Sequence, residues 1–208
     1  MASRSTYHHG NLRAALVEGA LALVAERGIG ALSVAEVARR VGVSSGAPYR
    51  HFAHRPALLA ATAVEMAHRL TASLRDVLPE LHEPLGDLDA VDVTARAAAA
   101  YTRFTIEHGA GLDLIFSDEL HGLDDRDLLE AGRAVMDALV PTAMTVTHGD
   151  ARAALRLIER QIAAAHGYAA LLRTGFLDRR HPTADDVADH VAAIARSVAL
   201  TSRDDALT

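Results

Sequence analysis

Apolar residues recur at intervals of three and four along most of the chain, and no run alternates apolar and polar residues as an exposed strand would. This spacing predicts an all-α protein with about nine helices. Glycines follow several of the apolar runs, where a residue without a Cβ ends a helix most easily. The predicted helices span residues 11–27, 33–41, a short segment from 44 or 45, a long one from about 56 to a break at 79–86, 88–108, 111–116, 124–147, 150–175 and a last one from 183.

Residues 33–55 hold the most specific pattern in the chain. A Ser-x-x-Glu capping box starts a short helix at Ser33, and Gly42 ends it. After a three-residue turn, Ser44 or Ser45 is placed to cap a second short helix that is polar, basic and aromatic. Two helices joined in this way form a helix-turn-helix, whose second helix enters the major groove of DNA. The alternative is an ordinary αα-hairpin, which the turn alone does not exclude.

Three segments around this pattern carry a resemblance to a known family. They read YHHGNLR (7–13), ALVAERGIGALSVAEVARRVGVSSGAPYRHF (22–52) and HRPALLAA (54–61). In order and spacing they resemble the DNA-binding domain of the TetR (tetracycline repressor) family. The resemblance implies an N-terminal three-helix helix-turn-helix domain over residues 1–55. It also implies a C-terminal helical domain over 56–208 that binds an effector and forms a dimer.

The resemblance further implies which residues contact DNA. Tyr49 and His51 are expected at phosphates, and Arg50 at base edges together with residues 45–47. Arg55 stands where the family usually has a lysine, and a guanidinium can replace an ammonium at a phosphate. The predicted DNA-binding residues are Ser33, Ser44, Ser45, Gly46, Ala47, Tyr49, Arg50, His51 and Arg55.

Two further segments, 101–120 and 163–175, are similar to a ligand domain of this family that is marked by a Trp-His-Gly constellation. His166 and Gly167 are present, but Ile162 stands where the tryptophan is expected, and the chain has no Trp. Polar and aromatic side chains among apolar helices predict an effector cavity, although they could equally be core residues. The candidates are Tyr101, Phe104, His108, Phe116, Met136, Met144, His166 and Tyr168.

The last two predicted helices carry continuous apolar stripes, from Leu155 to Leu172 and from Val187 to Val198. Small residues such as Gly167 lie beside the first stripe and permit a close approach of helices. Two such helices can pack with their copies into a four-helix bundle, so a homodimer is predicted. The alternative is that both stripes face the core of their own chain.

Charge divides the chain in the same place. Residues 1–60 carry seven arginines and three glutamates, a charge of +4, whereas the whole chain carries −6 and the remainder therefore −10. A basic end on an acidic body suits an approach to phosphates. The absence of cysteine excludes disulfides and thiolate metal sites. The histidines lack the spacing of a metal site, and no apolar run is long enough to span a membrane, which predicts a cytoplasmic protein without metal or cofactor.

Taken together, these features predict a transcriptional regulator that binds a palindromic DNA operator as a homodimer and acts as a repressor released by a small-molecule effector. One alternative is an activator or architectural DNA-binding protein without a ligand. Another is a helical enzyme or sensor that retains the hairpin only as a scaffold. No phosphate loop, nucleophile elbow or Cys/His pair occurs in the sequence, so we expect no enzyme activity.

Overall fold

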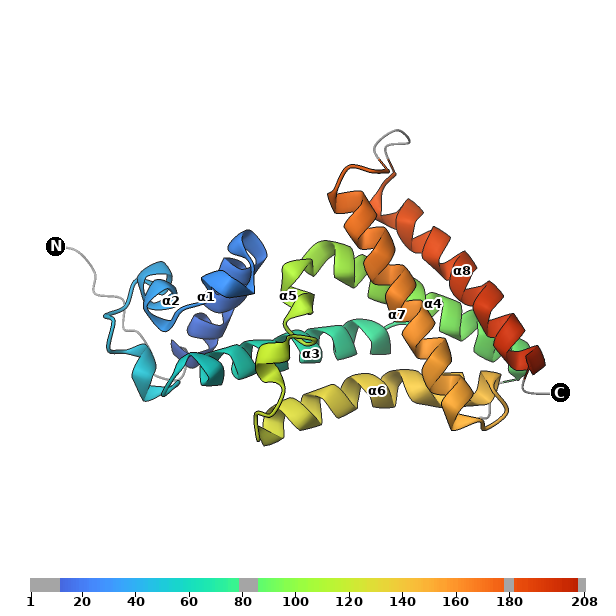
Figure 1. Ribbon diagram of the computed structural model, residues 1–208, viewed down its shortest axis with the longest axis horizontal. Helices are drawn as coiled ribbons and strands as arrows, with labels where there is room; N and C mark the ends of the chain where they lie inside the picture. The colour runs from blue at the N-terminus through green and yellow to red at the C-terminus, as the bar shows by residue number, and fades with distance from the viewer. Residues whose placement is uncertain (1–11, 79–85, 178–181, 206–208) are drawn as a thin grey trace. The chain divides into compact units, whose positions relative to one another are not determined.

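The computed structural model describes residues 12–78, 86–177 and 182–205 (Figure 1). Over these residues the regular structure is entirely helical, with eight α-helices and three short 3₁₀ helices, which confirms the all-α class. None of the described helices is long and apolar enough to cross a membrane. The predicted break at 79–86 and residues 7–11, which include His8 and His9, lie largely outside the described residues.

The chain folds into two compact units. The first comprises Met1–Ala67 and Ala110–Gly132, and the second comprises His68–Gly109 and Arg133–Thr208. The chain therefore leaves the first unit, returns to it and leaves it again. These units do not follow the predicted functional boundary at residue 55, which stays a prediction.

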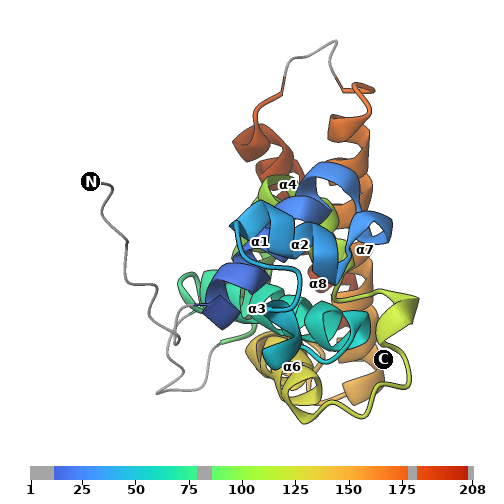
Figure 2. The same cartoon turned by 90° about the vertical axis from the view of Figure 1, so that its left-hand side faces the viewer.

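Helices α1 (Leu12–Arg27) and α2 (Val34–Val41) begin the first unit and pack on each other (Figure 2). Both end at a glycine with positive φ, Gly28 and Gly42, as the sequence predicts. A Cβ at Gly19 would come within 2.7 Å of the Val41 side chain. The close approach of α1 to α2 therefore depends on a residue without a side chain at this position.

The segment after α2 differs from the prediction. A turn at residues 45–47 leads into a 3₁₀ helix, Pro48–Arg50, in place of an α-helix capped by Ser44 or Ser45. Pro48 has no N–H to donate to the carbonyl of Ser44, and its ring crowds the preceding turn. The helical hydrogen-bond pattern is therefore interrupted at Pro48.

The remainder of the first unit comes from two distant parts of the sequence. Helix α3 (Arg55–Arg75) begins beside a proline in its first turn, as predicted. Helix α5 (Ala110–Asp113), a 3₁₀ helix (Asp118–Leu120) and the start of α6 (Arg126–Val146) follow later in the chain. A Cβ at Gly111 would lie 2.8 Å from Cε of Met66, so α5 approaches α3 closely within this unit.

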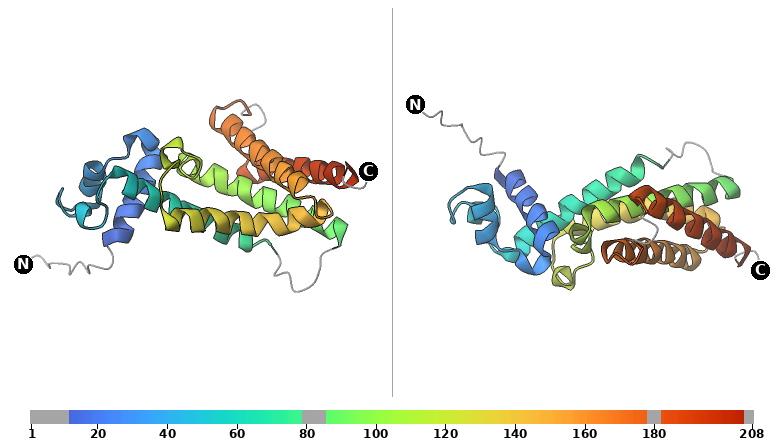
Figure 3. Two further views of the ribbon diagram at one scale, coloured as in Figure 1. Left: turned by 60° about the horizontal axis from the view of Figure 1, so that its bottom comes forward. Right: turned by 90° about the horizontal axis from the view of Figure 1, so that it is seen from above.

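The second unit is built on three long helices, α4 (Asp87–His108), α7 (Ala151–Arg173) and α8 (Ala184–Asp205). Helix α8 packs along both α4 and α7 (Figure 3). Their ends follow the sequence closely. The carboxylate of Asp150 accepts hydrogen bonds from the first backbone N–H groups of α7, and Thr183 with Asp186 forms a reciprocal capping box before α8.

The predicted apolar stripe of α7 is buried only in part. Ile158 and Ala165 of this stripe are buried, whereas Leu155 is 47% exposed and Ile162 is half-buried. Gln161, which lies outside the predicted stripe, is buried as well. An apolar part of α7 is left on the surface of the unit.

Candidate nucleic-acid interface and effector cavity

The turn between α2 and α3 exposes most of the predicted DNA-binding residues. Buried Pro48 and Phe52 bracket Tyr49, Arg50 and His51, which are all exposed. Tyr49 is 54% exposed, a high value for a large aromatic side chain. The two buried residues hold the short 3₁₀ turn against the unit, and the three consecutive side chains between them remain accessible.

The serines and small residues before this turn are also at the surface. Ser44, Ser45 and Gly46 are exposed, and Ala47 is half-buried. Ser33 is exposed too, and its Oγ accepts a hydrogen bond of 3.1 Å from the backbone N–H of Glu36. Its predicted role as a helix cap is therefore present in the structure, whereas its predicted phosphate contact stays a prediction.

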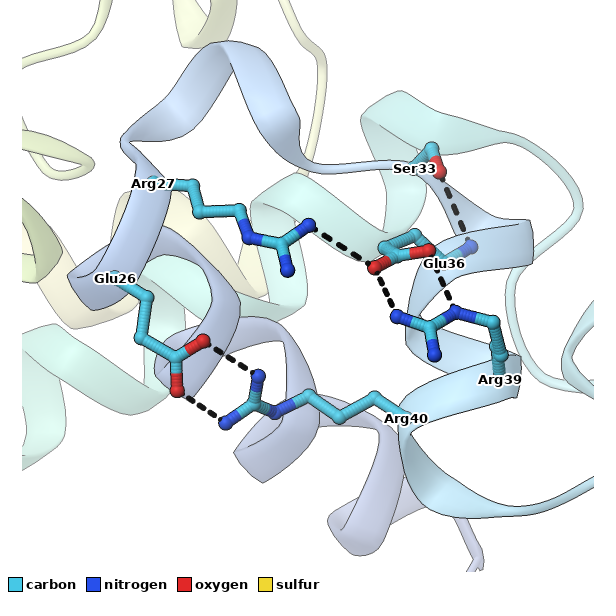
Figure 4. Close-up of polar contacts among 6 residues, drawn as sticks. All are labelled: Glu26, Arg27, Ser33, Glu36, Arg39 and Arg40. Carbon is cyan, nitrogen blue, oxygen red and sulfur yellow. Dashed lines mark hydrogen bonds and ion pairs between the residues drawn. The ribbon is translucent and has the colours of Figure 1, made fainter.

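Two glutamates bind most of the nearby arginines (Figure 4). Arg40 donates two hydrogen bonds to Glu26, one of them 2.8 Å long. Glu36 accepts bonds of 3.0 and 2.6 Å from Arg39 and one of 3.3 Å from Arg27. The hydrogen bonds from Arg40 and Arg39 lower the pKa of Glu26 and Glu36, respectively. Each of these three arginines is therefore paired with an acidic side chain of its own unit, and two of them share one carboxylate.

Arg55 is held by three groups of the first unit. Its Nε donates to the carbonyl of Leu32 at 2.7 Å, and Nη2 donates to the carbonyl of Ile29 at 3.1 Å. Its guanidinium also forms a two-pronged ion pair with Glu119, and this hydrogen bonding lowers the pKa of the Glu119 carboxyl group. The predicted phosphate contact of Arg55 would have to replace one of these partners.

Arg50 differs from the other arginines of this unit. Arg13 lies over the ring of Phe52 at 5.4 Å, Arg126 pairs with Glu130, and the remaining ones are bound as described above. Among the described residues, Arg50 has no acidic or aromatic partner. The exposed turn therefore presents a full positive charge between a tyrosine and a histidine, which is the chemistry that phosphates and guanine edges bind.

The second unit contains a small cavity between α4, α6 and α7. The cavity has space for about one water molecule. Five of its seven lining side chains are aliphatic, and the two polar ones are Tyr101 and Gln161. The lining residues are Ala97, Ala98, Tyr101, Leu139, Ile158, Gln161 and Ile162.

The predicted cavity residues are only partly brought together. The hydroxyl of Tyr101 lies 3.0 Å from Nε2 of His166, and the rings of Phe104 and His108 are 4.2 Å apart. Of these four residues, Tyr101 lines the cavity. Met136, Met144 and Tyr168 are half-buried elsewhere in the same unit, and Phe116 is 50% exposed and belongs to the first unit. The ligand roles of these residues stay predictions.

Gln161 is a candidate that the sequence reasoning missed. It is 9% exposed, and its Nε2 has no hydrogen-bond partner among the described residues. Its position was a usable signal, because a polar residue four places from both Leu157 and Ala165 stands on the buried face of the helix. The lining of the cavity therefore includes a polar side chain that composition alone would assign to the surface.

The all-α fold and its exposed basic turn define a helix-turn-helix regulator that binds DNA. The family model described as bacterial regulatory proteins of the tetR family matches residues 16–62. The chain belongs to the TetR family of transcription regulators. No match to a curated protein was found.

Solved structures share this fold over nearly the whole chain. A Rhodococcus protein of unknown function is 32% identical, with a TM-score of 0.70 over 93% of this chain and 98% of its own. A tetR-family regulatory protein, also from Rhodococcus, is 19% identical with a TM-score of 0.64, covering 89% and 95%. The regulator FadR from Bacillus subtilis in complex with stearoyl-CoA is 14% identical with a TM-score of 0.61, covering 88% and 97%.

Proposed function

We propose that this regulator is a repressor that binds a palindromic operator as a homodimer and is released when a small molecule enters the second unit. The observation that carries the DNA-binding part is Arg50, which lies on an exposed turn and has no acidic partner among the described residues, whereas the arginines of α1 and α2 near it form ion pairs. A fold relative that holds stearoyl-CoA supports the effector part. The proposal includes no catalytic step, and it places the protein in the cytoplasm, where bacterial DNA lies.

In this proposal the exposed turn enters the major groove. Tyr49 and His51 bind phosphates, and Arg50 reads a guanine through its two-pronged guanidinium. Because phosphate contacts release counterions, affinity falls steeply with salt. A gel-shift titration of the DNA beside its own gene, at two salt concentrations, tests the proposal. Binding that does not depend on salt, or no binding to that DNA, would overturn it.

A homodimer formed through α7 and α8 would explain the apolar surface of α7. Leu155 is largely exposed there, and the exposed Gly167 permits another helix to approach closely. On α8, Ile194 and Val198 are only half-buried within their own chain. Four helices, two from each copy, can bury these side chains in one bundle.

The oligomeric state tests this interface. Leu155→Asp places a carboxylate in the proposed contact, where it would be desolvated without a partner at a cost of at least about 2 kcal/mol. Light scattering is expected to show a monomer. Leu129→Asp is the matched control, since Leu129 is 54% exposed in the first unit and this variant is expected to remain a dimer. A dimeric Leu155→Asp protein would place the interface elsewhere.

The order of residues along the chain offers a route from the cavity to the turn. Helix α4 carries Tyr101 and ends at His108, and the following segment returns to the first unit, where Glu119 holds Arg55 at the start of α3. An effector that prefers one arrangement of this segment by about 3 kcal/mol would lower operator affinity roughly 100-fold. By reciprocity, operator DNA would weaken effector binding by the same factor.

A further inference from the structure

Gln161 carries a buried side-chain amide in the second unit. It lies on α7 between side chains of the helical core, and its Nε2 has no hydrogen bond among the described residues. An unsatisfied buried donor costs about 1–3 kcal/mol, and leucine or methionine at this position would avoid that cost. The cost is recovered when a molecule in the cavity offers an acceptor to this amide.

The surroundings of the amide restrict the chemistry of such a molecule. Leu139, Ile158 and Ile162 form an aliphatic wall, and no lysine or arginine lines the cavity. A carboxylate or phosphate would therefore enter without a cationic side chain in the lining to pair with it, which is unfavourable in an apolar site. A neutral oxygen acceptor avoids this penalty and still satisfies Nε2.

Cavity size adds a second restriction. The present space matches about one water molecule, so a larger guest must separate the side chains that line α4 and α7. The α4 wall is formed by Ala97, Ala98 and Tyr101, of which the two alanines are as small as a side chain can be. A compact ligand is therefore accommodated by a modest displacement of these helices.

We infer that the effector is a compact, uncharged and mostly apolar molecule with one carbonyl-type acceptor, which the Nε2 group of Gln161 binds. This inference rests on the proposed function, because it names the ligand class of the proposed effector site. It assigns Gln161 as the specificity-determining residue of that site. The other polar residue of the lining, Tyr101, lies on α4, and its hydroxyl is 3.0 Å from Nε2 of His166.

Three probes of nearly equal shape test the ligand class on the full-length protein. Cyclohexanone carries the acceptor, methylenecyclohexane lacks it, and cyclohexanecarboxylate adds a charge. Ligand-observed NMR is expected to show cyclohexanone binding about 10-fold or more tightly than either of the other two. Equal or tighter binding of the hydrocarbon or the carboxylate would overturn the inference.

The variant Gln161→Met removes the amide and keeps the length of the side chain. We expect it to lose the preference for cyclohexanone over methylenecyclohexane. It should melt no lower than the original protein, because the amide has no partner to lose. A variant that kept the ketone preference would remove Gln161 from the site. A clearly lowered melting temperature would show that the amide is a structural group, and would also overturn the inference.

Thr94→Val is the matched control. Thr94 is buried on α4, its Oγ1 also lacks a hydrogen-bond partner, and it does not line the cavity. The variant should leave the ketone preference unchanged, and a loss of preference there would show that the effect is not specific to Gln161. These measurements use no DNA. Ketone selectivity without operator binding would therefore refute the proposed repressor alone, and operator binding without selectivity would refute the ligand class alone.

Discussion

The two compact units differ in the kind of polar group that their candidate sites present. In the first unit, charged side chains lie on the surface and neutralise one another, as Arg40 and Glu26 do. In the second, polar atoms lie among alanine-rich helices, where Thr102 and Thr105 donate to carbonyls one turn earlier. Among the described residues, Arg50 at the first candidate site has no acidic or aromatic partner, and Nε2 of Gln161 at the second has no hydrogen bond.

Arg50 and Gln161 are polar groups of different kinds. Arg50 is an exposed cation, which water solvates at little cost until a phosphate or a base replaces the water. Gln161 is a buried amide, and its Nε2 lacks a hydrogen bond among the described residues, so a molecule in the cavity that offers an acceptor would satisfy it. If both proposals hold, binding at the first site is governed by salt, and binding at the second by the shape and acceptors of the ligand.

The largest expected effect separates paired from unpaired arginines in the first unit. Arg50→Ala should weaken operator binding by about 1–3 kcal/mol and relax base preference, because a two-pronged contact to guanine is lost. Arg40→Ala should change operator affinity much less, since Glu26 already neutralises that guanidinium. Gel-shift titration of both variants measures the difference. Equal losses would mean that pairing within the chain does not decide which arginine reads DNA.

A smaller effect is expected when the hydroxyl of one tyrosine in each unit is removed. Tyr101→Phe removes the hydroxyl that lies 3.0 Å from His166 in the interior, and should lower the free energy of unfolding by about 1 kcal/mol. Tyr49→Phe removes an exposed hydroxyl and should leave stability unchanged while weakening DNA binding. Denaturant titration and gel shift on both variants provide the readouts. A destabilised Tyr49→Phe protein would contradict the surface role of the turn.

The smallest expected effect is the response of the helix cap on α7 to acid. Hydrogen bonds from the backbone N–H groups of Ala153 and Arg152 lower the pKa of Asp150 below its ordinary value of 3.8. The folded form therefore binds this proton less readily than the unfolded form, so the cap stabilises above that value and is lost as the pH falls through the lower, folded one. Asp150→Asn keeps an acceptor without a charge. Its thermal melts should depend less on pH below about 4, and an unchanged slope would remove Asp150 as a source.

Local signals predicted the helix ends well. The cap at Ser33, the left-handed Gly42 and the box at Thr183 are each decided by residues within four positions, and all three occur in the structure. The exposed turn is likewise specified by residues close together in the sequence. The 3₁₀ helix at Pro48–Arg50 departs from the predicted α-helix, because proline has no backbone N–H to donate.

Long-range pairings could not be predicted in this way. Arg55 and Glu119 are 64 positions apart, and Glu26 and Arg40 are 14 apart on different helices, so no spacing rule connects them. The burial of Gln161 depended on how far the core extends around α7 beyond the predicted stripe. Packing against α4 and α8 decides this extent, and the sequence of α7 alone does not.

The return of residues Ala110–Gly132 to the first unit has a consequence for protein engineering. An N-terminal fragment that ended after Ala67 would lose Glu119, the partner of Arg55, and helix α5, which approaches Met66 closely. A chimeric regulator that joins the first unit to another receptor domain should therefore include the later segment as well. The first unit is encoded in two separate parts of the gene, and both must be transferred together.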